Sequence, residues 1–161
     1  MARYYVWVTS QACAQNKLFL SILNTTADQI VKLESLYLVN SKLSSVTGVG
    51  IEFDALKITA ITGGTAVTPV PADSGDGTAA SFTCVHTATS VTGSTIFFSH
   101  FTSDDEVGVT GAFPTQMIER FGNLLPTPLI LKKNIGLALK QITASTAGSF
   151  GVLAIVNILQ V

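Results

Sequence analysis

The glycine pair Gly63-Gly64 looks more like a ligand-binding loop than any other stretch of this chain. It lies within KITAITGGTAVTPVPADSGDG, residues 57–77. A phosphate loop of the Walker type continues into Gly-Lys-Ser/Thr and a helix, because backbone N–H groups and the helix dipole hold the phosphate. Here the run Thr-Ala-Val-Thr follows the glycines, and Pro69 removes a backbone donor. The pair therefore predicts the tight turn of a β-hairpin, since glycine supplies the positive φ that such turns require.

The residues after this turn predict a sheet edge and a loop. Proline cannot donate to a β-ladder, so Pro69 and Pro71 place the return run 65–70 at an edge. Residues 72–77, ADSGDG, are typical of a flexible loop. We expect Asp73 and Asp76 there to be available for contact with a neighbouring subunit.

The chain's two histidines, His86 and His100, are candidates for metal binding or acid–base catalysis. Cys84 precedes His86 by two residues, so the two side chains share one face of an expected strand. No Cys-x-x-Cys or His-x-x-x-His spacing accompanies them. A structural or surface role is therefore favoured, and we expect no metal site and no cofactor.

The acidic run Asp104, Asp105 and Glu106 could help to bind a hard cation. Consecutive residues of a loop cannot all point at one ion without further backbone carbonyl ligands. The run therefore predicts a solvated turn between strands, or a charge complement to a partner's basic patch.

Glu52 and Asp54 fall on one face of an expected strand, as the two carboxylates of a glycosidase might. They form a lone pair, and Leu56 shares their face. The Gly-x-Ser-x-Gly pattern of a nucleophile elbow is missing from the sequence. We therefore expect no catalytic residues and no enzymatic activity.

Three aromatic residues, Tyr4, Tyr5 and Trp7, stand near the N-terminus ahead of a polar loop. Aromatic faces can stack on sugars, and they can equally dock into a protein surface. We favour an N-terminal arm, residues 1–17, that reaches a neighbouring subunit, or a plain core role, over a lectin site.

The elements that would position these residues are strands, because the dominant period of the sequence is two. Apolar residues on both faces of residues 150–158 predict a strand that is central or covered on both sides. With residues 135–143 it predicts a C-terminal hairpin. In residues 30–39 the apolar positions change parity around Ser35, which indicates a β-bulge or a strand that changes sheets. Further strands are expected at residues 4–8, 18–23, 51–61, 80–86 and 95–101.

The segment TQMIERF, residues 115–121, is the best candidate for a helix and is at most about two turns long. The sequence therefore predicts an all-β chain, a single-domain antiparallel β-sandwich or jelly-roll-like barrel over residues 1–161. No composition break or fixed-period repeat divides it.

The composition restricts the kinds of partner. Charged residues make up 12 % of the chain, and nine scattered Lys and Arg give a net charge of -1. No basic stripe follows a nucleic-acid backbone, so nucleic-acid binding is disfavoured. The apolar runs are far shorter than the roughly 20 residues of a membrane span, and no secretory leader is expected. Weak charge favours self-association, and Cys13 and Cys84 are expected to be small buried hydrophobes more often than a disulfide.

The order of these segments resembles small accessory virion proteins of tailed bacteriophages. The resemblance rests on LFLSILN, QIVKLESLYLVN, ITAITGGTAVTPVPADS and PLILKKNIGLALKQ, and it spans most of the chain in loose form. Within that group the chain is most similar to capsid decoration, or cement, proteins.

The resemblance implies a virion protein on the outer surface of the capsid. Such a protein binds the major capsid protein, commonly as a homotrimer, and stabilises the shell by bridging its subunits. Alternatives are a tail, neck or fibre component, or a carbohydrate-binding module. The residues expected to make assembly contacts are Arg3, Tyr4, Tyr5, Trp7, Asp73, Asp76, Asp104, Asp105 and Glu106.

Overall fold

A computed structural model describes residues 2–40, 46–77, 82–106, 116–120, 128–146 and 148–160. Every regular element among these residues is a β-strand, and the strands pack as an antiparallel sandwich that does not close into a barrel. The predicted all-β fold is therefore confirmed. The strands are β1 (Ala2–Ala12), β2 (Leu18–Asn24), β3 (Gln29–Asn40), β4 (Val46–Ile58), β5 (Ala60–Thr62), β6 (Thr65–Ala66), β7 (Val70–Pro71), β8 (Phe82–His86), β9 (Ser90–Thr92), β10 (Thr95–Glu106), β11 (Gln116–Arg120), β12 (Leu129–Leu131), β13 (Gly136–Gln141) and β14 (Ser149–Gln160).

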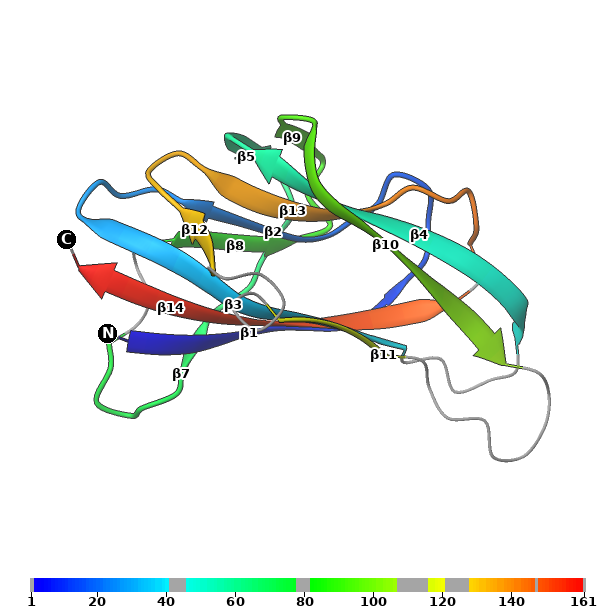
Figure 1. Cartoon of the computed structure of the whole chain (residues 1–161), viewed down its shortest axis with the longest axis horizontal. Coiled ribbons are helices and arrows are strands. Elements are labelled where there is room, and N and C mark those ends of the chain that lie inside the picture. Colours follow the sequence, from blue (N-terminus) through cyan, green and yellow to red (C-terminus); the bar gives the residue numbers. More distant parts are fainter. Residues whose placement is uncertain are drawn as a thin grey trace.

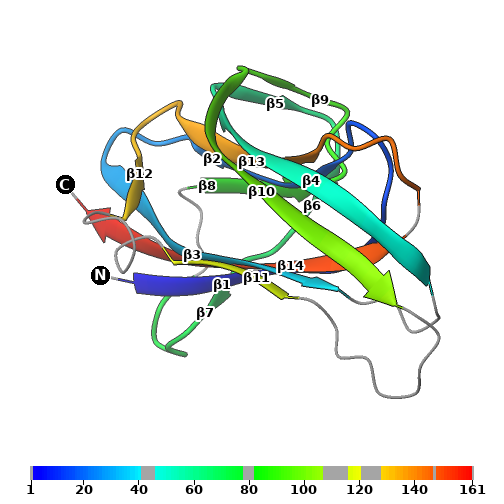
Figure 2. The same cartoon turned by 45° about the vertical axis from the view of Figure 1, so that its right-hand side comes forward.

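Two sheets form the layers of the sandwich (Figure 1). Sheet A has the order β11-β3-β14-β1-β7, and β12 also pairs with β3. Sheet B has the order β10-β4-β13-β2-β8-β6. Successive strands β1 to β4 alternate between the two sheets, so most of the pairing joins segments that are distant in the sequence (Figure 2).

The main core lies between the sheets and takes alternate residues from each inner strand. Val152, Ala154 and Val156 of β14 are fully buried in it. Phe53 stands edge-to-face against Phe19 and Phe150, with ring centroids 5.4 Å and 5.5 Å apart. This geometry is the one that aromatic quadrupoles favour. Strand β14 is central in sheet A, as its two-sided apolar pattern predicts.

The parity change in β3 is a β-bulge. Ser35 pairs with Ile155 of β14, whereas Leu33 pairs with the next residue, Val156, which leaves Glu34 as the additional residue. One of the two explanations expected for this segment is therefore confirmed, and the bulge turns Glu34 toward the outer side of sheet A.

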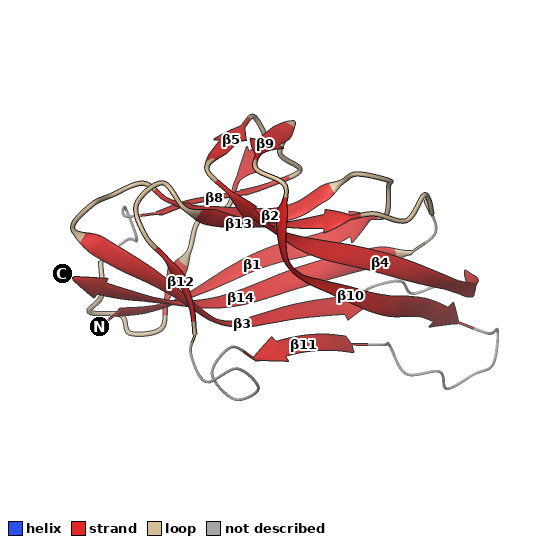
Figure 3. Ribbon diagram, turned by 45° about the horizontal axis from the view of Figure 1, so that its top comes forward, coloured by secondary structure: helices blue, strands red, loops and turns tan. Residues whose placement is uncertain are grey.

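A second, smaller core lies on the outer side of sheet B. The two-stranded ribbon of β5 and β9 stands over this side of sheet B (Figure 3). Ile61 and Val91 of that ribbon pack against the buried residues of the second core. The buried residues are Leu18, Leu56, Ile58, Val85, Ala88 and Ala138. The β5–β9 ribbon thus covers part of the outer side of sheet B.

Two sequence predictions about pairing are wrong. Residues 116–120 form the edge strand β11, not a helix, and pair with β3 from Gln116↔Val39 to Arg120↔Ser35. A short segment with two adjacent apolar residues fits either period, and strand pairing decides it. The C-terminal strands do not form a hairpin, because β13 pairs with β2 and β4 while β14 pairs with β1 and β3.

The N-terminal segment is an inner strand of the sandwich and not an arm that leaves it. Strand β1 pairs with β14 from Ala2↔Ile158 to Ala12↔Ser149 and with β7 through Tyr4 and Tyr5. The expected return run 65–70 is divided between β6 and β7. Each is the last strand of its sheet, so the predicted edge position is confirmed, whereas the single strand is not.

Two fully buried amides tie loops to the core. The Gln141 side chain accepts from the Ala14 N–H at 3.0 Å and donates to the carbonyls of Thr143 and Ser145. The Asn24 amide donates to the carbonyl of Leu131, and its oxygen accepts from the Thr26 N–H. Both side chains satisfy backbone groups that would otherwise be buried unpaired.

Candidate binding face

The Gly63-Gly64 pair is a corner between two sheets, and the hairpin prediction for it is wrong. Strand β5 before the pair belongs to the ribbon with β9, while β6 after it pairs with β8 of sheet B. Both glycines have positive φ, 65° and 96°. A Cβ on Gly64 would lie 2.9 Å from the Ala88 Cα, so the corner requires glycine for its conformation and its space.

The histidine and cysteine candidates do not converge on a site within the described residues. His86 is half-buried, and its Nδ1 lies 2.9 Å from the Thr87 hydroxyl. Cys13 and Cys84 are buried and are not joined in a disulfide, which confirms the favoured interpretation of both. Burial raises the pKa of the Cys84 thiol well above its ordinary value. The described part of the chain contains no cluster of three His, Cys, Asp or Glu residues placed to hold an ion.

The acidic candidates are also separated from one another. Asp104, Asp105 and Glu106 lie in the last positions of β10, so the predicted turn is wrong for the backbone of this run. Asp54 is 7 % exposed and accepts a hydrogen bond of 2.6 Å from the Ser99 hydroxyl. A buried carboxylate held by a neighbouring hydroxyl accounts for Asp54 in structural terms.

The feature that stands out is the outer face of sheet A. We use this name for the side chains of β1, β3, β7, β12 and β14 that point away from the core. Cross-strand pairing arranges them in rows. Trp7, Leu153 and Tyr37 form one row, and Val70, Tyr5 and Ile155 form the next. Tyr5, Trp7 and Val70 are 39 %, 47 % and 58 % exposed.

The tyrosine and tryptophan side chains gather mainly on this face. Three of the four tyrosine and tryptophan residues, Tyr5, Trp7 and Tyr37, lie on the outer face. The fully buried aromatics, in contrast, are the phenylalanines Phe19, Phe53 and Phe150. Tyrosine and tryptophan are the residues that protein interfaces use most as energetic anchors. Nothing in the described part of the chain covers this face as the β5–β9 ribbon covers sheet B.

Trp7 is held in place by the strand beside it. A Cβ on Gly151 of β14 would lie 3.0 Å from the Trp7 Cη2 and 3.4 Å from its Cζ2, so the ring rests over the glycine. An indole supported in this way loses less side-chain freedom on binding than a free one would.

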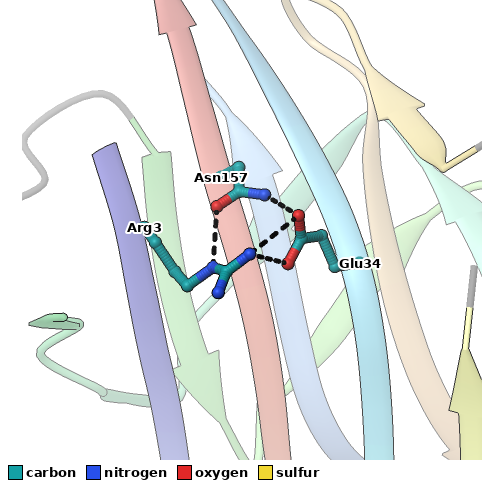
Figure 4. Close-up of polar contacts among 3 residues, drawn as sticks. All are labelled: Arg3, Glu34 and Asn157. Carbon is teal, nitrogen blue, oxygen red and sulfur yellow. Dashed lines mark hydrogen bonds and ion pairs between the residues drawn. The ribbon is translucent and has the colours of Figure 1, made fainter. Parts of the chain in front are cut away.

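The other end of the face is polar (Figure 4). A row across four strands contains Arg3, Asn157, Lys32 and Ile130. The Arg3 Nε donates to the Asn157 Oδ1 at 3.3 Å, and its Nη2 lies 3.0 Å from the Glu34 Oε2. The Asn157 Nδ2 donates to the Glu34 Oε1. Asn157 is 1 % exposed, so the three side chains form a network anchored in the sheet.

The remaining N-terminal candidates lie elsewhere. Tyr4 is buried on the core side, where its hydroxyl donates to the Gly77 carbonyl at 2.8 Å. Asp73 and Asp76 belong to an ordered turn beyond β7, in which the Asp73 carboxylate accepts from the Gly75 N–H. The structure therefore brings Arg3, Tyr5 and Trp7 together on one face, with the 72–77 turn at its edge.

Sequence reasoning missed the residues that β3 and β14 contribute to the face, above all Tyr37, Leu153 and Asn157. The signal was the two-sided apolar pattern of residues 150–158, which leaves one apolar set outside the core. Tyr37 and Trp7 lie on either side of Leu153 because of the strand order, which no local sequence pattern predicts.

No described helix is long and apolar enough to cross a membrane. Comparison of the chain with protein-family models, with curated proteins and with solved structures finds no match.

Proposed function

We propose that the chain is a structural virion protein that binds the outer surface of a phage capsid and stabilises the shell. In this proposal the outer face of sheet A docks on the major capsid protein, and the chain works as a homotrimer that bridges neighbouring subunits. The observation that carries the docking face is the aromatic cluster of exposed Tyr5 and Trp7 with half-buried Tyr37. The capsid as partner rests on the sequence resemblance.

The physical properties of the chain suit this role. An interlocked sandwich with two-sided strand pairing resists local opening, as a protein on a shell under internal pressure must. When each copy contacts several subunits of a lattice, modest single interfaces combine to give a high overall avidity. The exposed part of Trp7 is about 120 Å² if 47 % of a large aromatic surface is free, which corresponds to roughly 3 kcal/mol when covered.

The first test is the copy number of the chain in purified virions, measured by quantitative mass spectrometry. Hundreds of copies per particle support a shell decoration protein. About six or twelve copies would contradict it and indicate a tail or neck component, because such a component forms a closed ring with a small, fixed number of subunits.

The second test is binding to purified shells that lack the chain. Trp7→Ala is expected to weaken binding by up to about 100-fold, the equivalent of the roughly 3 kcal/mol above. Phe97→Ala is the matched control, since Phe97 is an aromatic residue, 36 % exposed, on β10 of sheet B. Equal losses in the two variants would show that the outer face of sheet A is not the docking surface. Thermal melting of each variant checks that the fold is retained.

A second candidate function is carbohydrate binding, favoured by the aromatic side chains that share a row on the outer face of sheet A. Trp7 and Tyr37 stand two strands apart, roughly 10 Å, on either side of Leu153. This function predicts that soluble oligosaccharides raise the melting temperature of the wild-type chain and not that of Trp7→Ala. A set of phage-receptor glycans that produces no shift would exclude it for those sugars.

A further inference from the structure

The polar end of the outer face carries an excess of positive charge. Arg3 and Lys32 flank Asn157 in one row, and Glu34 is the acidic side chain next to them. Among the described residues of the rows defined above, these three are the charged groups, and their sum is +1. In the turn beyond β7, the Asp73 carboxylate accepts a hydrogen bond from the Gly75 N–H.

The Arg3 guanidinium is held in place by two neighbours, yet one of its nitrogens remains available for a further hydrogen bond. Its Nε bonds to Asn157 and its Nη2 to Glu34, while its side chain remains 49 % exposed. The Nη1 group makes no hydrogen bond or ion pair with the described part of the chain, and Figure 4 shows that it lies away from both partners. A guanidinium held by a buried amide is oriented before binding, so less side-chain entropy is lost when it meets a further acceptor.

Lys32 adds a second, looser donor on the same row. Its ammonium has no ion pair within the described residues, and its neighbours across the strands are Asn157 and Ile130. Ile130 is 42 % exposed, so the cationic end of the face is bordered by apolar surface on this side as well.

We propose that the outer face of sheet A binds an acidic segment of its protein partner, with a carboxylate against Arg3 and Lys32 and apolar side chains against Tyr5, Trp7 and Tyr37. This inference rests on the proposed function and specifies the chemistry of the capsid surface that the face fits. A carboxylate suits a fixed guanidinium because two charge-assisted bonds can form in one plane. A single net positive charge beside an apolar surface matches one or two carboxylates and not a polyanion.

The test uses the full chain, purified shells that lack it, and binding curves at about 50 mM and 300 mM salt, where screening differs strongly. Arg3→Gln is expected to weaken binding about tenfold at low salt, as loss of an interface anchor does, and to reduce the salt dependence. Lys32→Gln should have a smaller effect of about threefold. Lys57→Gln is the matched control, because Lys57 is exposed on β4 of sheet B and its loss changes the net charge equally.

Glu34→Gln separates the free Arg3 nitrogen from the internal ion pair. It removes the competing carboxylate charge and keeps an acceptor oxygen, so binding should stay within about twofold or become tighter. A loss as large as that of Arg3→Gln would overturn the inference, since it would show that the Arg3–Glu34 pair itself is the contact.

The remaining outcomes distinguish failure of this inference from failure of the proposed function on which it rests. If Trp7→Ala weakens binding while Arg3→Gln and Lys57→Gln both behave as the wild type, the docking face stands and the acidic partner is wrong. If the wild-type chain does not bind shells at all, both proposals fail together. Melting curves of the Arg3 and Glu34 variants confirm that each is folded at the temperature of the assay.

Discussion

Gly136→Ala is expected to destabilise the sandwich strongly, although it adds a single methyl group. Gly136 begins β13 in the interior of sheet B and pairs with Leu23 of β2 and Ile58 of β4. A Cβ built there would lie 2.2 Å from the Ile22 carbonyl oxygen and 3.0 Å from both the Leu23 Cα and the Ile58 Cγ1. Two of these atoms are backbone, so no rotation of a flexible side chain can relieve the contact.

The expected magnitude follows from that geometry. An ordinary carbon contact is at least about 3.4 Å, so β2 and β13 would have to separate by roughly 1 Å where their ladder bonds hold them together. Overpacking of a well-packed interior costs about 1–3 kcal/mol, and the loss of ladder geometry places this variant at the upper end, about 3 kcal/mol. For a chain of this size the melting temperature should fall by roughly 6–12 °C.

Gly50→Ala is the matched control in the same sheet. Gly50 belongs to β4, and a Cβ there meets nothing within 4 Å. Alanine in a strand is about as stable as glycine or up to about 1 kcal/mol better, so this variant should be neutral or slightly stabilised. Urea unfolding followed by intrinsic fluorescence measures both. A Gly136→Ala chain that unfolds within about 0.5 kcal/mol of the wild type would refute the close approach of β13 to β2.

Three other changes test separate parts of the structure. Gln141→Glu replaces a buried donor that two loop carbonyls use and should cost at least about 3 kcal/mol in urea unfolding, while the exposed Gln160→Glu should change stability by under about 0.5 kcal/mol. Burial raises the pKa of Cys84 in the folded chain, so below about pH 8.5 the thiol is protonated in both the folded and the unfolded chain, and its ionisation does not lower the free energy of unfolding. Above that pH the thiol ionises only in the unfolded chain, and the free energy of unfolding falls by up to about 1.4 kcal/mol per pH unit. Urea unfolding of Cys84→Ala from about pH 8 to 10 should lack this part of the decrease. Gly64→Ala should cost about 2 kcal/mol in a melting experiment, because φ is 96° and the Ala88 backbone lies at the new Cβ; a change under about 0.5 kcal/mol would mean the corner relaxes.

Local patterns in the sequence were sufficient for most of the strands. Alternation of apolar residues identified β1, β2, β3 and β14, and a change of parity located the bulge that turns Glu34 outward. Proline chemistry placed β7 at an edge. These features depend on the period of the backbone or on a missing donor, both of which a short stretch of residues displays.

Pairing between distant segments is where sequence reasoning was wrong. Residues 116–120 carry too few apolar positions to separate a strand from a helix, and their pairing with β3 settles the matter. The seven-residue connection before β14 is long enough to cross from sheet B to sheet A, so closeness in sequence did not make a hairpin of β13 and β14. The same holds for the corner at Gly63-Gly64, whose flanking strands pair with β9 and β8.

The sequence by itself determined that this chain is all-β and that Tyr5 and Trp7 share one face of a strand, because both follow from a period of two. Only the tertiary structure decided what stands beside them. Strand order set Leu153 between Trp7 and Tyr37, and it put Asn157 between Arg3 and Lys32. Leu153 and Asn157 of β14 lie more than a hundred residues from the partners that flank them, and cross-strand packing of a whole sheet, not local preference, brings these residues together.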